Sequence, residues 1–74
     1  MQYRNLAAEM TRADITASEI SNNIDLSEAS FSLKMHGKRA WKLKEMTLIQ
    51  EMINQKLDKN YTLDYLFEPV KEGA

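Results

Sequence analysis

Two helix starts stand close together in the first half of this chain, and they restrict its fold more than any other feature. Thr16 is followed three residues later by Glu19, which is the capping-box pattern that begins a helix. Ser27 caps a second start, with Glu28 in the favourable first turn. Two short helices joined by a tight turn predict a helix-turn-helix, with helices at about residues 17–24 and 28–36.

The rest of the chain also predicts helices, so the expected fold is all-α. Gly and Pro total three residues, and no stretch alternates apolar and polar side chains for long enough to form a strand. Apolar residues at helical spacing predict three further helices, at about Tyr3–Ala13, Leu43–Leu57 and Thr62–Phe67. A chain of 74 residues has room for one core, so residues 1–74 are expected to form a single domain.

Local signals also predict how the two central helices pack and end. Asp25 stands in the turn at a position that often needs a positive φ, which Asp tolerates better than most residues. Gly37 suits the left-handed position that ends a helix. Phe31 and Met35, four apart, should face inward, and Trp41 is expected in the core, with base stacking as its alternative role.

Composition excludes several classes of function. The chain has no Cys and one His, so neither a thiolate metal site nor a nucleophile–base pair can be assembled, and we expect no enzyme activity, metal or cofactor. No apolar run approaches the roughly 18–20 residues of a membrane span, and the N-terminus lacks the apolar region of a signal peptide. The expected location is the cytoplasm.

Charge is distributed unevenly along the chain. The formal net charge is −1, yet no acidic residue lies between Glu28 and Glu45, a segment that holds half of the Lys and Arg residues. A local cationic stripe is typical of a surface that faces phosphates. The predicted phosphate contacts are Ser27, Lys34, His36, Lys38, Arg39, Lys42 and Lys44. Ser27 and His36 have helix capping as an alternative role.

The outer arc of the second helix is the predicted reading surface for DNA. At 100° per residue, Glu28, Ala29, Ser32, Leu33 and His36 fall on one arc of about 140°, and Phe31 and Met35 lie outside it. We expect base contacts from Glu28, Ala29, Ser32 and Leu33: a carboxylate for cytosine, apolar groups for thymine methyls and a hydroxyl for either base or phosphate. Leu33 has a contact with a partner protein as its alternative.

The segment Phe31–Glu45, FSLKMHGKRAWKLKE, resembles the signature FSxKLNGKRxFTLxE of small prophage-type regulators in the Cro/repressor-like (XRE) helix-turn-helix family. Tyr61–Phe67, YTLDYLF, is similar to the last helix of that family, and the resemblance covers about residues 3–68. It implies a five-helix lambda-repressor-like domain that binds a two-fold operator as a dimer and represses or switches transcription in a bacterial or phage-infected cell.

The chain departs from the family pattern at four positions. The family often has Gln, which contacts phosphate, where Ala17 stands, and a small Ala where Ser21 stands. Gly is usual in place of Asp25, and a capping Thr in place of Lys42. A lysine beside a helix N-terminus is unfavourable unless an anion lies nearby, and DNA phosphate is the anion we expect.

Two assignments of partners remain open. The dimer interface is predicted at Tyr61, Tyr65, Phe67 and Val70, although these residues would alternatively only close the core. The rival to double-stranded DNA as the main partner is another regulatory protein, which would make the chain an antirepressor or modulator. The absence of Gln, Asn and Arg from the outer arc and the net charge of −1 favour this rival.

Overall fold

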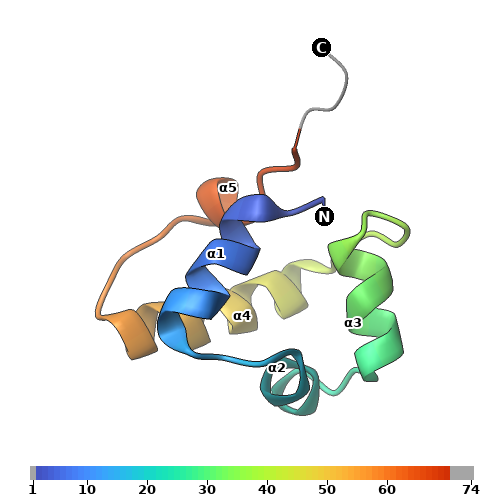
Figure 1. Cartoon of the computed structure of the whole chain (residues 1–74), viewed down its shortest axis with the longest axis horizontal. Helices are drawn as coiled ribbons and strands as arrows, with labels where there is room; N and C mark the ends of the chain where they lie inside the picture. Colours follow the sequence, from blue (N-terminus) through green and yellow to red (C-terminus); the bar gives the residue numbers. More distant parts are fainter. Residues whose placement is uncertain (1, 71–74) are drawn as a thin grey trace.

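Five helices and no strand make up the structure, a computed structural model that describes residues 2–70 (Figure 1). The helices are α1 (Arg4–Ala13), α2 (Ala17–Asn23), α3 (Glu28–Met35), α4 (Leu43–Leu57) and α5 (Leu63–Leu66). The predicted all-α class is therefore confirmed over these residues, and the bounds of α4 agree with the prediction at both ends. Met1 and residues 71–74 of the predicted domain lie outside the described residues.

Short polar side chains begin three of the helices. The hydroxyl oxygens of Thr16, Ser27 and Thr62 each accept a hydrogen bond, 3.1 Å long, from the backbone N–H three residues further on. Glu19 completes the capping box because its carboxylate accepts from the Thr16 N–H at 3.4 Å. Both predicted caps of the central helices are confirmed.

Four residues adopt the left-handed conformation where the chain turns. Gly37 follows α3 with φ 76° and Asp25 lies between α2 and α3 with φ 58°, as predicted. Asp14 and Asp58 adopt the same conformation at the ends of α1 and α4, which was not anticipated. Aspartate therefore ends two helices where glycine is more common.

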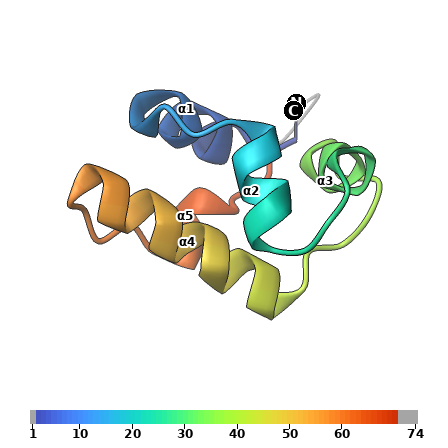
Figure 2. The same cartoon turned by 90° about the horizontal axis from the view of Figure 1, so that it is seen from below.

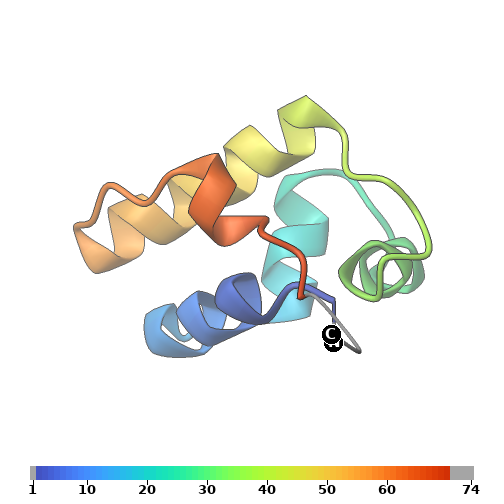
Figure 3. The ribbon, with the colours of Figure 1, turned by 90° about the horizontal axis from the view of Figure 1, so that it is seen from above.

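The core lies where α1, α4 and α5 pack on one another, with α2 joining them and α3 set against α2 (Figures 2 and 3). Leu6, Ile20, Ile49, Ile53 and Leu66 are completely buried there. These residues come from four helices, and Met46 and Leu57 of α4 pack against them while only partly buried. The core is therefore continuous from the N-terminal to the C-terminal helix.

Trp41 joins the loop before α4 to this core. Its ring makes edge-to-face contacts with Phe31 and Phe67, with centroids 5.7 and 5.3 Å apart, and with Tyr3 at 6.2 Å. The predicted core position of Trp41 is confirmed.

The two ends of the described chain meet beside α3. The Gln2 N–H donates to the Met35 carbonyl at 3.2 Å, and the Val70 N–H donates to the Gln2 carbonyl at 2.8 Å. The N-terminal segment thus links the last turn of α3 to the segment that follows α5.

None of the helices within residues 2–70 combines the length and the apolar composition that crossing a lipid bilayer requires.

Candidate nucleic-acid interface

The turn between α2 and α3 places the two helices at an angle, with α2 between α3 and the rest of the molecule (Figure 2). The Leu26 N–H donates to the Ser21 carbonyl at 2.9 Å, which closes the turn around the left-handed Asp25. Leu26 is partly buried and packs against the core, so its side chain fills the angle between the two helices. This arrangement leaves α3 along one side of the molecule.

One side of α3 is buried and the other is open. Phe31 and Met35 point inward and are almost completely buried, as predicted. Glu28, Ala29, Ser32 and His36 are exposed, and Leu33 is half-buried. The predicted outer arc is therefore accessible, with Leu33 at its edge.

Ser27 lies at the beginning of this arc and is exposed. Its hydroxyl accepts from the Ser30 N–H at 3.1 Å and donates to the Ser30 hydroxyl at 3.0 Å. Capping is thus the role that the structure gives to Ser27.

Four cations lie on the loop after α3 and on the first residues of α4. Lys38, Arg39, Lys42 and Lys44 are all exposed. The loop leaves the end of α3 and passes along the same side of the molecule to the beginning of α4 (Figures 1 and 2). None of the four forms an ion pair within residues 2–70, and no acidic residue lies between Glu28 and Glu45 in the sequence, so positive charge gathers along this segment.

The prediction that Lys34 contacts phosphate is wrong. Only 5% of Lys34 is exposed, because its ammonium turns inward and forms an ion pair with Glu45, with Nζ 2.5 Å from Oε1. The ammonium also lies 5.9 Å from the centre of the Trp41 ring. A helical wheel contains a signal for this burial, because position 34 lies about 60° from position 31 on the inward side.

Glu45 explains how α4 begins without a capping side chain at Lys42. A lysine ammonium offers no acceptor, and the Glu45 carboxylate instead accepts from the Lys42 N–H at 3.0 Å. Burial alone would raise the pKa of Glu45, but the hydrogen bonds from Lys34 and from the Lys42 N–H outweigh it and lower the pKa. Glu45 is a structural residue of this surface that sequence reasoning missed.

The predicted dimer residues do not form one surface. Tyr61 and Tyr65 stack on each other, with ring centroids 5.2 Å apart, and Tyr65 is 36% exposed. Phe67 is only 7% exposed and packs on Trp41 and Tyr3, so its predicted place in an interface is wrong. Val70 is half-buried beside Gln2, at the end of the segment that follows α5.

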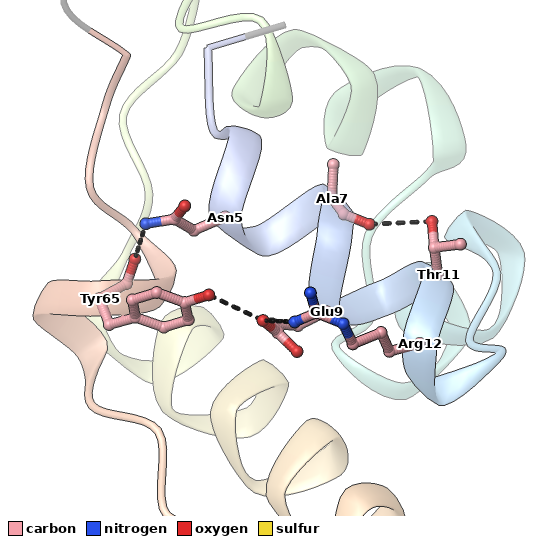
Figure 4. Close-up of polar contacts among 6 residues, drawn as sticks. All are labelled: Asn5, Ala7, Glu9, Thr11, Arg12 and Tyr65. Atoms are coloured by element: carbon pink, nitrogen blue, oxygen red, sulfur yellow. Dashed lines mark hydrogen bonds and ion pairs between the residues drawn. The ribbon is translucent and has the colours of Figure 1, made fainter.

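A buried carboxylate behind the stacked tyrosines was not predicted. Glu9 is completely buried, and its Oε2 accepts from the Tyr65 hydroxyl at 2.7 Å and from Arg12 at 2.6 Å (Figure 4). Burial would raise the pKa of Glu9, but the hydrogen bonds from Tyr65, Tyr61 and Arg12 lower it overall. Glu9 thereby ties α1 to α5.

Ser21 and Ala17, two residues that differ from the signature the sequence resembles, add no polar group to the open side of α3. Ser21 is almost completely buried, and its hydroxyl has no hydrogen-bond partner among residues 2–70. Ala17 is half-buried and offers only a methyl group where the family often has a phosphate-binding Gln. Neither position adds a polar contact to the surface of α3.

No protein-family model, curated protein or solved structure matches this chain.

Proposed function

We propose that this protein is a sequence-specific regulator that binds double-stranded DNA, with the lambda-repressor-like helix-turn-helix fold of the Cro/repressor-like family. In this proposal α3 lies in the major groove, and Glu28, Ala29, Ser32 and Leu33 contact base edges. Lys38, Arg39, Lys42 and Lys44 contact the phosphates on either side, and Ser27 and His36 add polar contacts at the two ends of α3.

One observation supports this function above all: the open side of α3 continues directly into four exposed cations with no acidic residue among them. An α-helix fits the major groove of B-DNA, and cations beside it supply the sequence-independent part of the affinity. The chemistry of the arc favours thymine methyls and cytosine amino groups over bidentate purine contacts.

A selection of bound sequences from random double-stranded DNA tests the proposal. The wild-type chain should enrich a defined motif, and the double variant Lys38→Ala/Arg39→Ala should retain much less DNA. Lys56→Ala/Lys59→Ala is the matched control: it removes the same charge from exposed residues at the C-terminal end of α4, a helix about 22 Å long. Failure of the wild type to enrich any motif, or equal losses in both variants, would contradict the proposal.

A second candidate function is binding to another regulatory protein. An apolar hollow of about 320 Å³ lies between α1, α2 and α3, and its walls include Met10, Ile15 and Phe31. Ser32 and His36 stand at its edge, and Leu33 lies on the same helix. A partner protein that covered this region would also cover the proposed DNA surface. A complex of this chain with another regulator, as an antirepressor or modulator, would therefore contain no DNA.

A further inference from the structure

The helix α3 is held to the rest of the molecule in a restricted way. Its main helical neighbour is α2, whereas α1, α4 and α5 pack on one another. Figure 2 shows α3 standing apart from α4, with α2 on its inner side. The orientation of α3 therefore depends on a few additional contacts near its C-terminal end.

Several contacts hold that end besides the burial of Phe31 and Met35 in the core. The Met35 carbonyl accepts from the Gln2 N–H, the Phe31 ring meets the edge of Trp41, and Lys34 pairs with Glu45. The aromatic contact is edge-to-face and belongs to the continuous core, so it remains when the ion pair is removed. The ion pair is directional, because a buried ammonium must meet a carboxylate at hydrogen-bond distance to offset its lost hydration.

Glu45 is shared between the two parts of the proposed DNA surface. One of its oxygens, Oε1, accepts both from Lys34 on α3 and from the Lys42 N–H at the beginning of α4. With 5% of Lys34 and 7% of Glu45 exposed, neither group is free to turn to solvent while the core is intact. A single carboxylate oxygen therefore links α3, which would contact bases, to the loop and the beginning of α4, which would contact phosphates.

We propose that Lys34 and Glu45 are positioning residues that determine sequence discrimination without touching DNA. This inference rests on the proposed function. The pair fixes the angle between α3 and the basic loop, so that base and phosphate contacts form in the same complex. Loss of the pair leaves the exposed cations in place and lets α3 tilt, which weakens the reading of bases and spares non-specific binding.

The test compares two affinities for each variant: one for the DNA sequence selected by the wild type and one for an unrelated duplex of equal length. The double variant Lys34→Met/Glu45→Gln removes the ion pair, leaves no buried charge without a partner and keeps an amide oxygen for the Lys42 N–H. Its ratio of specific to non-specific affinity should fall about tenfold, the effect of one lost base-pair contact, with non-specific affinity changing less than about twofold. Lys38→Met is the matched control and should weaken both affinities equally.

Each outcome decides the inference. An unchanged ratio in a double variant whose circular dichroism shows it to be folded overturns the positioning role while leaving the proposed function intact. A wild type that selects no sequence overturns both. If the double variant does not fold, Lys34→Arg carries the test, because its guanidinium keeps the buried charges paired while its larger planar head changes the spacing between α3 and Glu45. The ratio should fall in the same direction, and an unchanged ratio overturns the inference.

Discussion

At the scale of single residues, the two lysines closest to the end of α3 have opposite roles. Lys34 is buried and paired, and Lys38, four residues on, is exposed. Composition and charge counting treat both as members of one cationic stripe, yet only the exposed residue is available to a phosphate. The difference follows from the direction in which each side chain leaves the helix or loop.

Replacing Lys34 by Ala should be one of the most destabilising single changes in the chain. It leaves the buried Glu45 carboxylate without its partner, at a cost of about 3–5 kcal/mol in the free energy of unfolding. Lys38→Ala is the control and should change that energy by less than about 0.5 kcal/mol. Urea denaturation of the two variants measures both values, and similar midpoints would contradict the buried pair.

At the scale of helices and turns, the end of α3 depends on a glycine. Gly37 has φ 76°, and a Cβ there would come within 3.0 Å of Gln2 Cγ and Cδ. Gly37→Ala should therefore cost about 1–2 kcal/mol, since an L-residue pays that much for the left-handed conformation.

The reverse change at the other left-handed position next to α3, in the turn before it, provides the comparison. Asp25→Gly removes a Cβ from a left-handed position with φ 58°, and relief of strain should roughly offset the greater freedom of glycine in the unfolded chain. Thermal unfolding should thus place Gly37→Ala well below the wild type and Asp25→Gly close to it. A Gly37→Ala variant as stable as the wild type would contradict the left-handed end of α3.

The elements that could be predicted from the sequence are those that local chemistry specifies. Thr16 and Glu19 cap each other within four residues, and Gly37 ends α3 by its own backbone freedom, so a short window contains the whole signal. The pair of Lys34 and Glu45 spans eleven residues and forms only when α3 and α4 are already placed. Phe67 was misassigned for the same reason, because its contact with Trp41 depends on how α5 returns to the core.

At the scale of the whole molecule, two buried carboxylates make stability sensitive to acid. The pKa values of Glu9 and Glu45 are lowered in the folded protein from an ordinary value of 4.5. Their contribution is therefore fully present above about pH 4.5 and is lost as the pH falls through the lowered values. The free energy of unfolding should decrease from pH 6 to pH 3.

A matched pair of variants checks the origin of this acid sensitivity. Glu9→Gln should be less stable than the wild type at pH 6 and should lose less stability on acidification, because one of the two groups is gone. Glu51→Gln, on the exposed side of α4, should follow the wild-type curve. Denaturant titrations at a series of pH values provide the measurement, and parallel curves for all three proteins would count against the role of Glu9.

A dimer is the expected form of the whole molecule on a two-fold operator. The stacked Tyr61 and Tyr65 are the part of the predicted interface that remains at the surface. Sedimentation at micromolar concentrations should show a dimer for the wild type and a monomer for Tyr61→Asp, which places two like charges in the interface. Leu43 is 69% exposed and lies at the other end of α4. Leu43→Ser should therefore leave the sedimenting mass of the dimer unchanged. A wild type that stays monomeric would contradict this interface.

The dependence of DNA affinity on salt tests the central claim most directly. Each subunit has four exposed cations. If about three to four of them contact phosphate, a dimer makes about six to eight contacts, which predicts a slope of about −5 to −7 in a plot of log K against log salt concentration. The wild-type chain, titrated against its selected duplex between low and physiological salt, should lose affinity with this steepness. A flat response would mean that the basic surface beside α3 does not face DNA.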